Sequence, residues 1–330
     1  MSVIRRREFI TLLGGAAATW PLPGIAQHAG RVRLIGMLMP YPEGDVNAQA
    51  RVQVFRQELT RLGWPESGVR YDVRFTTDNM DQVRTAAASL VAIKPDVIVC
   101  VGDRVVAVLR QLTRSVPVVA IASDLAGSGF VEGLARPGGN VTGFSVIEFS
   151  VIGKMVGILK ELVSGISRVG IMYNPDNPVG AIYLRSFETV SAGLGFQPID
   201  LPVHQVAEIE RAVETLAESP NAGFIVPPDV TLITLSTKIA AIAALHRVPA
   251  IYSSSLYAKA GGLASYGSNI NDLTLKQAFY VDRVLRGARP DDLPIQQPTK
   301  FDLVINLKTA KALGLDVPPT LLARADEVIE

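Results

Sequence analysis

The sequence predicts an α/β protein made of two doubly wound parallel-sheet domains with a hinged cleft between them. Two observations support this prediction. Strand-like and helix-like segments alternate along most of the chain, and the alternation restarts after a glycine-rich break at 136–143. Strands joined by short helical crossovers form a parallel sheet with helices on both faces. The 330 residues are enough for two such domains.

The first series of segments runs from residue 32 to residue 122. Its helices are recognised by apolar residues that recur every three or four positions, as Val52, Phe55 and Leu59 do. Its third strand is a continuous apolar run at 96–101, which indicates burial on both faces. The predicted strands are 32–39, 69–75, 96–101 and 116–122, and the predicted helices cover 52–62, 82–93 and 105–112.

The second series repeats the same order without a recognisable residue-level repeat. Helices are predicted at 152–162, 182–194, 208–217 and 232–246, and strands at 169–173, 197–203, 223–226 and 249–253. The tail adds strands at 262–266 and 301–306, with helices at 272–285 and from 308. Because these pieces should complete both sheets, we expect one lobe of residues 30–143 plus 254–294 and another of 144–253 plus 295–330.

The first 26 residues have the order of an export signal. A twin-arginine pattern of Arg6, Arg7 and Phe9 precedes an apolar run at 10–20, which is short for a membrane span. A proline-rich end follows and leads to Ala26, where we expect cleavage. The mature chain is therefore expected to be soluble and periplasmic.

Charge and motif content argue against several functions. The 32 Lys and Arg residues balance 31 Asp and Glu residues, so no nucleic-acid partner is expected. The single cysteine, Cys100, lies in an apolar strand, and the three histidines are far apart, so no metal site is expected. The glycines of 127–133 have their third member one place late for a dinucleotide loop. We therefore expect no cofactor.

Candidate binding residues follow from the rule that open α/β sheets bind ligands beyond the carboxyl ends of their strands. Each has a structural alternative. Asp103 and Asp229 precede helices and could be N-caps, while Asp124 and Asn174 could close turns. The residues selected are Tyr41, Asp103, Ser123, Asp124, Thr142, Gly143, Asn174, Asp229, Tyr252 and Tyr266.

For an amino-acid-like ligand, the sequence suggests a division of roles among these residues. Asp124 is expected to pair with the ammonium group, and donors around Thr142 and Gly143 with the carboxylate. Tyr41 or Tyr266 is expected to pack on the ligand side chain, with Tyr266 on the side of the first lobe.

Several strings also resemble those of a known family. They are LARPGGNVTG at 134–143, GGLASYG at 261–267, DLPIQQPTKFDLVIN at 292–306, KTAKALGL at 308–315 and ARADEVI at 323–329. The mature chain resembles the substrate-binding proteins of ABC importers that are similar to tryptophan- and tyrosine-binding proteins. This resemblance implies two domains of the periplasmic-binding-protein type I fold, hinged around a cleft. Asp103 stands where many relatives carry a small hydroxyl residue.

Binding without chemistry is thus the function expected from the sequence. The expected partners are a small-molecule ligand and an ABC permease in the inner membrane, and the protein is expected to be a monomer. Two alternatives stay open at this point, a periplasmic enzyme on the same scaffold and a sensory ligand-binding module, because a fold does not determine a function.

Overall fold

The computed structural model describes residues 31–77, 79–146 and 151–330. The predicted signal segment at 1–26 lies outside these residues. Within the described part of the chain, no helix combines the length and the apolar character that a membrane span requires.

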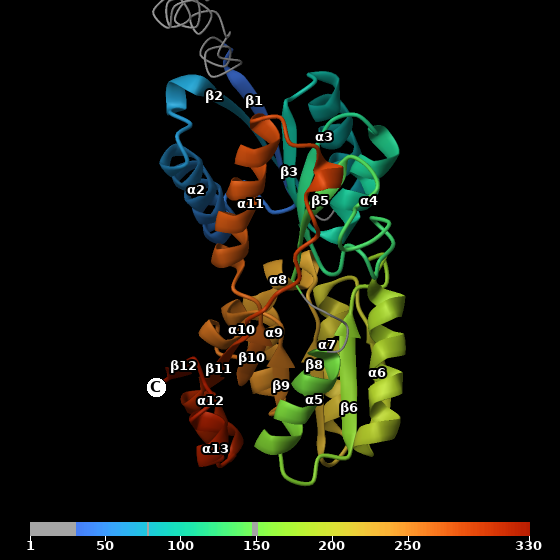
Figure 1. Cartoon of the computed structure of the whole chain (residues 1–330). Helices are drawn as coiled ribbons and strands as arrows, with labels where there is room; N and C mark the ends of the chain where they lie inside the picture. The colour runs from blue at the N-terminus through green and yellow to red at the C-terminus, as the bar shows by residue number, and fades with distance from the viewer. Residues whose placement is uncertain (1–30, 78, 147–150) are drawn as a thin grey trace, which may run out of the picture. The chain divides into compact units, whose positions relative to one another are not determined.

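The first lobe is built on a five-stranded parallel sheet with the order β2-β1-β3-β4-β5. Helices α2 and α11 pack together on one face, and α3 and α4 pack on the other (Figure 1). The elements are β1 Arg33–Met39, α2 Val46–Arg61, β2 Val69–Phe75, α3 Met80–Ala92, β3 Val97–Val101, α4 Asp103–Leu112, β4 Val118–Ala122, β5 Val141–Ser145 and α11 Ile270–Leu285, with short 3-10 turns at Glu66–Gly68 and Pro290–Asp292.

Burial on both faces explains the apolar strands of this sheet. All five residues of β3 are buried, and they alternate between the core beneath α2 and α11 and the core beneath α3 and α4. Local capping sets the helix starts, because the Asp45 and Asn79 side chains accept hydrogen bonds from the first turns of α2 and α3. Sequence pattern and tertiary burial therefore agree in the first lobe.

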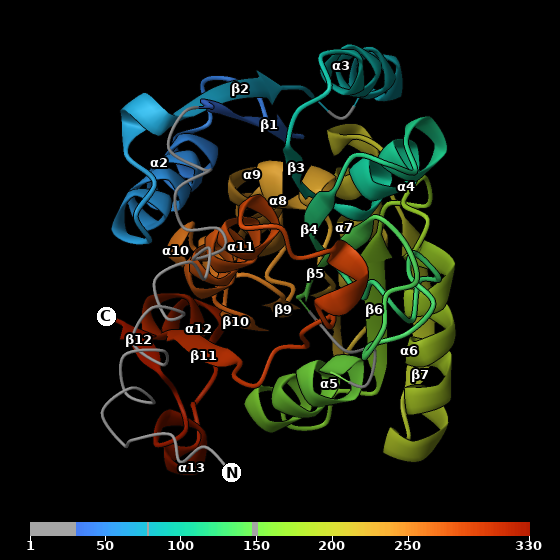
Figure 2. The ribbon, with the colours of Figure 1, turned by 45° about the horizontal axis from the view of Figure 1, so that its top comes forward.

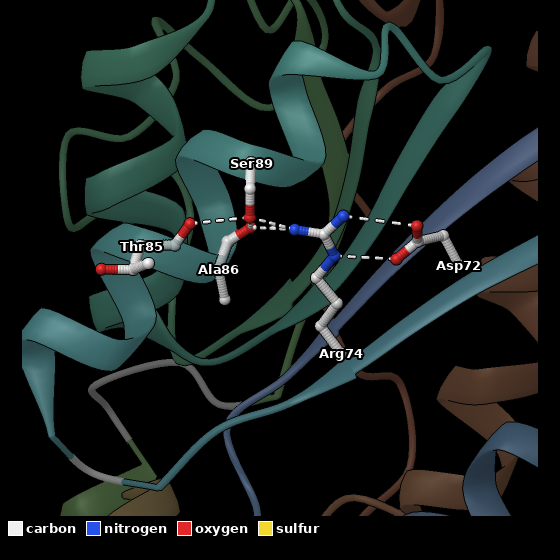
Figure 3. A network of polar contacts seen from close by, with 5 residues as sticks. All are labelled: Asp72, Arg74, Thr85, Ala86 and Ser89. Carbon is white, nitrogen blue, oxygen red and sulfur yellow. Dashed lines mark hydrogen bonds and ion pairs between the residues drawn. The ribbon is translucent and has the colours of Figure 1, made fainter.

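A polar network ties β2 to α3 at the edge of this sheet. The Arg74 guanidinium pairs with Asp72, with Nε 2.8 Å from Oδ1, and also donates to Ser89 and to the Ala86 carbonyl (Figure 3). Ser89 in turn donates to the Thr85 carbonyl of its own helix. These contacts hold the edge strand β2 against helix α3.

The second lobe contains a seven-stranded sheet with the order β12-β11-β10-β9-β8-β6-β7. Its pairs are parallel except for β10 with β11. Helices α5 and α6 cover one face, and α7 and α9 cover the other (Figure 2). The elements are α5 Val151–Leu162, β6 Arg168–Tyr173, α6 Gly180–Leu194, β7 Gln197–Pro202, α7 Val206–Ala217, β8 Ala222–Val226, α8 Val230–Thr234, α9 Ser236–Leu245, β9 Ala250–Tyr252, α10 Ser255–Lys259, β10 Ala264–Gly267, β11 Asp302–Asn306, α12 Leu307–Leu313, α13 Pro319–Leu322 and β12 Glu327–Ile329.

Three local features differ from the sequence expectation. The glycine-rich break contains the strand β5, which pairs with β4 along its whole length. The helix expected at 232–246 is divided into α8 and α9 at Leu235, where φ is −97° and ψ is 8°. A short final strand, β12, pairs with β11 although its alternation was too brief to indicate a strand.

The placement of β10 corrects the expected lobe division. Residues 254–294 were assigned to the first lobe, but β10 hydrogen-bonds with β9 and β11 in the second sheet. The chain returns to the first lobe only with α11, which lies beside α2. It returns to the second lobe after Gln296, whose backbone still bonds with Gly143 and Ser145.

Candidate functional site

A cavity of about 620 Å³ opens between the two lobes. Its walls come from chain segments that follow parallel strands: Tyr41 after β1, Asp103 after β3, Ser123 after β4, Asp229 after β8 and Ser253 after β9. This is the position that the topology of parallel sheets favours for a ligand. Both lobes therefore contribute polar groups to one cavity.

Asp103 is a buried carboxylate on the wall of the first lobe. It is the first residue of α4, preceded by Gly102 at a φ of 93°, so Gly102 rather than Asp103 has the N-cap position. Its two oxygens accept hydrogen bonds from the Ser123 backbone N–H at 3.0 Å and from the Ser123 hydroxyl at 2.6 Å. Burial raises the pKa of Asp103 to about 6, although the bonds from Ser123 act in the opposite direction.

Asp229 is a second buried carboxylate, on the wall of the other lobe. It is the N-cap of α8 and accepts from the Leu232 N–H at 2.9 Å, as the structural alternative for this residue predicted. Its other oxygen accepts from the Asn177 amide at 2.7 Å. Burial raises the pKa of Asp229, and its negative charge in turn adds to the raised pKa of Asp103. The two acids therefore repel each other across the cavity.

Tyr183, on α6, is a buried tyrosine near both acids. Its hydroxyl donates to the Pro228 carbonyl at 3.2 Å. Burial raises the pKa of Tyr183 well above its ordinary value, and the nearby negative charge of Asp103 raises it further.

Arg51 is the buried cation of the cavity wall. It lies on α2 with 8% of its surface exposed, and its Nη1 donates to the Tyr41 hydroxyl at 3.0 Å. The guanidinium carbon is 5.1 Å from the centre of the Tyr41 ring, a cation–π distance. Arg51 was not among the candidate residues selected from the sequence. Its signal was the spacing of four to Phe55 and eight to Leu59, which places it on the apolar face of the helix.

The remaining charged residues on the cavity wall form pairs with one another. Lys259 pairs with Glu327 at 3.2 Å, and Lys300 pairs with Asp302 at 3.0 Å and with Asp326 at 3.2 Å. These lysine side chains are 51% and 73% exposed, so the pairs lie at the solvated margin. The buried charges are therefore confined to Arg51, Asp103 and Asp229 among the described lining residues.

Four of the predicted site residues line the cavity and six do not. Tyr41, Asp103, Ser123 and Asp229 line it. Asp124, which was expected to bind an ammonium group, instead accepts from the N–H groups of Ala126 and Gly127 and closes a turn. Asn174 likewise accepts from the Asp176 N–H within a turn. Both follow the structural alternative because the chain bends sharply directly after their strands.

The other four predicted residues make packing contacts within the lobes. The Thr142 hydroxyl donates to the Leu293 carbonyl at 2.6 Å and is fully buried. Gly143 lies against the Ala120 backbone. Tyr252 is stacked on Tyr257, with ring centres 4.6 Å apart.

Tyr266 corrects a further expectation, because it belongs to β10 in the second lobe and not to the first. It is stacked on Phe301, with ring centres 5.4 Å apart. Neither Tyr252 nor Tyr266 is among the residues that line the cavity. Tyr41 is thus the one aromatic residue among the described lining residues.

The chain is similar to known proteins both in sequence and in fold. A family described as ABC transporter substrate binding protein matches residues 44–329. The tyrosine-binding protein of Clostridioides difficile is 22% identical over 282 residues, which are 85% of this chain and 80% of that relative. A conserved domain protein from Vibrio cholerae has a TM-score of 0.83 at 24% identity, covering 90% of this chain and 100% of that one. An ABC domain from Streptococcus pneumonia, solved in complex with L-Trp, has the same score and identity over 90% and 99% of the two chains. These solved structures share the fold of two α/β lobes.

Proposed function

Because the chain belongs to the family of ABC transporter substrate-binding proteins, we propose that it delivers a small amino-acid-like molecule to a permease in the inner membrane. The ligand occupies the cavity between the lobes and leaves it chemically unchanged. The leader at 1–26, with its twin arginines, supports a periplasmic location for the mature protein.

The observation that carries this proposal is the pair of buried acids that face one cavity. Burial disfavours the charge of both acids, and the negative charge of Asp229 further raises the pKa of Asp103. A ligand ammonium group would add a positive charge to that of Arg104, which lowers the pKa of Asp229, and would donate hydrogen bonds to both acids. The relatives named for tyrosine binding and solved with L-Trp support an amino-acid-like ligand.

The two-lobed arrangement explains how such a ligand would control the shape of the protein. Asp103 belongs to the first lobe and Asp229 to the second, so a cation between them contacts both lobes at once. Only the closed arrangement makes both contacts, and ligand binding therefore favours closure. A permease can distinguish the closed protein from the open one.

The test is native mass spectrometry of the mature chain, followed by calorimetric titration. The protein as purified should carry a small molecule, or should bind L-tyrosine, L-tryptophan or another L-amino acid at one site. The bound compound should be recovered with its mass unchanged after prolonged incubation. A protein that carries no small molecule and binds none of the twenty amino acids would contradict the proposal, and turnover of the compound would indicate an enzyme.

A further inference from the structure

The cavity wall contains a buried cation that has no acidic partner. Arg51 is more than nine-tenths buried, and no Asp or Glu of the described chain lies within ion-pair distance of it. Its Nη1 bonds to the neutral Tyr41 hydroxyl, and its Nε is buried without a hydrogen-bond partner. A guanidinium has five N–H donors, and the bond from Nη1 to Tyr41 is the one side-chain hydrogen bond of Arg51 within the described chain.

Arg51 differs in this respect from the other cations that line the cavity. Lys259 and Lys300 both have carboxylate partners and are largely exposed to solvent. Their charges are therefore already balanced and screened by water. Arg51 is the one lining cation of the described chain that is both buried and without an acidic partner.

A buried charge without a partner is costly, which suggests that the partner arrives with the ligand. Taking a guanidinium out of water is unfavourable unless an anion compensates for the lost hydration. The contact with the Tyr41 ring offsets part of this cost and restricts the orientation of the guanidinium before a ligand binds. A carboxylate is the anion that fits best, because its two oxygens can accept two N–H groups of a guanidinium side by side.

We propose that Arg51 binds the carboxylate of the ligand, at the side of the cavity formed by α2. This assignment rests on the proposed function and makes it more specific. The acids Asp103 and Asp229 hold the positive end of the ligand, and Arg51 holds its negative end. The carboxylate site therefore lies on α2, and not at Thr142 and Gly143 as the sequence suggested.

The test compares three matched sets of probes by calorimetric titration and thermal shift. The sets are the L-amino acids, the amines that remain when their carboxylate is removed, and the acids that remain when their amino group is removed. The strongest amino-acid binder should lose at least about 30-fold in affinity when its carboxylate is absent, because a buried charged pair is then broken. The mature wild-type chain is used throughout.

Arg51→Met and Arg56→Met form a matched pair of variants for the same titrations. Arg56 lies on the same helix, stacks on Tyr71 at 4.7 Å and also has an unpartnered Nε, but it does not line the cavity. Arg51→Met should weaken the binding of the amino acid at least about 30-fold and change the affinity for the amine little. Without ligand, this variant should melt at the wild-type temperature or higher. Arg56→Met should leave both affinities within about threefold.

The outcomes separate this assignment from the proposed function. If the amines bind as tightly as their parent amino acids, or if Arg51→Met keeps the wild-type affinity, the protein is still a binding protein but Arg51 is not its carboxylate site. If Arg51→Met fails to fold, the comparison of amino acid with amine on the wild-type chain decides the question alone. If no probe of any set binds, the proposed ligand class and the assignment of Arg51 both fail.

Discussion

Asp103 shows how the fold changes the chemistry of a single residue. Its side chain is 5% exposed, and burial raises its pKa from the ordinary value of 3.8 to about 6. Between these two values the folded protein binds more protons than the unfolded chain does. The contribution of Asp103 to the free energy of unfolding is therefore most favourable at low pH and is lost as the pH rises through about 6.

This difference predicts the effect of Asp103→Asn on stability. The substitution removes the titrating group, so the melting temperature of the variant relative to wild type should rise as the pH increases from 4 to 7.5. A shift from 3.8 to about 6 corresponds to about 3 kcal/mol, and the opposing effect of the hydrogen bonds from Ser123 is already contained in that shift. Thermal melts of the ligand-free protein across this range measure the effect.

Asp81→Asn is the control, because the Asp81 side chain is 91% exposed. The difference in melting temperature between Asp81→Asn and wild type should vary little between pH 4 and 7.5. A pH-independent difference for Asp103→Asn would contradict the raised pKa and would remove the electrostatic reason for a cation at this site.

At the residue scale, the sequence selected four of the residues that line the cavity and did not select its buried cation, Arg51. Position directly after a parallel strand was enough to select Asp103, Ser123 and Asp229. It could not separate them from Asp124, because only the folded turn shows that backbone N–H groups already occupy that carboxylate. Arg51 was missed because an arginine on a helix is usually solvated, and the burial of this one is not a local feature of the sequence.

The strand β5 shows why one glycine is required within an element. Gly143 has a φ of 143°, and a Cβ at this position would lie 1.9 Å from the Ala120 carbonyl oxygen on β4. No residue with a Cβ fits at that distance, and the clashing atom belongs to the backbone of β4, which cannot shift by itself. The flanking Thr142 and Phe144 are fully buried, so the strand cannot move away without uncovering the core.

Gly143→Ala should therefore destabilise the protein by about 3 kcal/mol or more, as changes that force a buried backbone apart do. Gly139→Ala in the same string is the matched control, because a Cβ there meets nothing within 4 Å. Urea unfolding of the two variants measures the difference. Equal stability of both would show that β5 can adjust and that its glycine is not structurally required.

At the element scale, the type of most segments could be predicted, but some pairings could not. The period of apolar residues identified the strands and helices that form each core, such as β3 and α2. The glycine of β5 concealed a strand, because glycine is depleted in strands on average. β10 belongs to the second sheet because it hydrogen-bonds with β9 and β11. The residues 264–267 do not by themselves predict these partner strands.

At the scale of the whole molecule, the two lobes approach each other closely beside the cavity. Gly102 of the first lobe and Val230 of the second nearly touch, since a Cβ on Gly102 would lie 2.9 Å from a methyl carbon of Val230. Chain crossings after β5, after β10 and after Gln296 connect the lobes. The two sheets are separately packed, so motion between lobes need not disturb either core.

This contact predicts that a larger side chain at position 230 keeps the lobes apart. Val230→Phe should place its ring against Gly102 and disfavour the closed arrangement by about 1–3 kcal/mol, a typical cost of overpacking. Ligand affinity should then fall by about 5- to 150-fold, because the ligand needs the closed lobes. Val230 is partly buried and packs against the core of the first lobe, so thermal melts of the variant without ligand measure its stability cost separately from its affinity.

Small-angle scattering with and without the ligand found by native mass spectrometry separates this effect from a simple loss of contact. Wild type should become more compact when ligand is added, whereas Val230→Phe should keep the larger radius of gyration until the ligand concentration is raised in proportion to its weaker affinity. Leu245→Phe, at a side chain that is 77% exposed on α9, should behave as wild type. A wild-type protein that does not contract on binding would show that the lobes are rigid, and the affinity of Val230→Phe would then report only the local shape of the cavity.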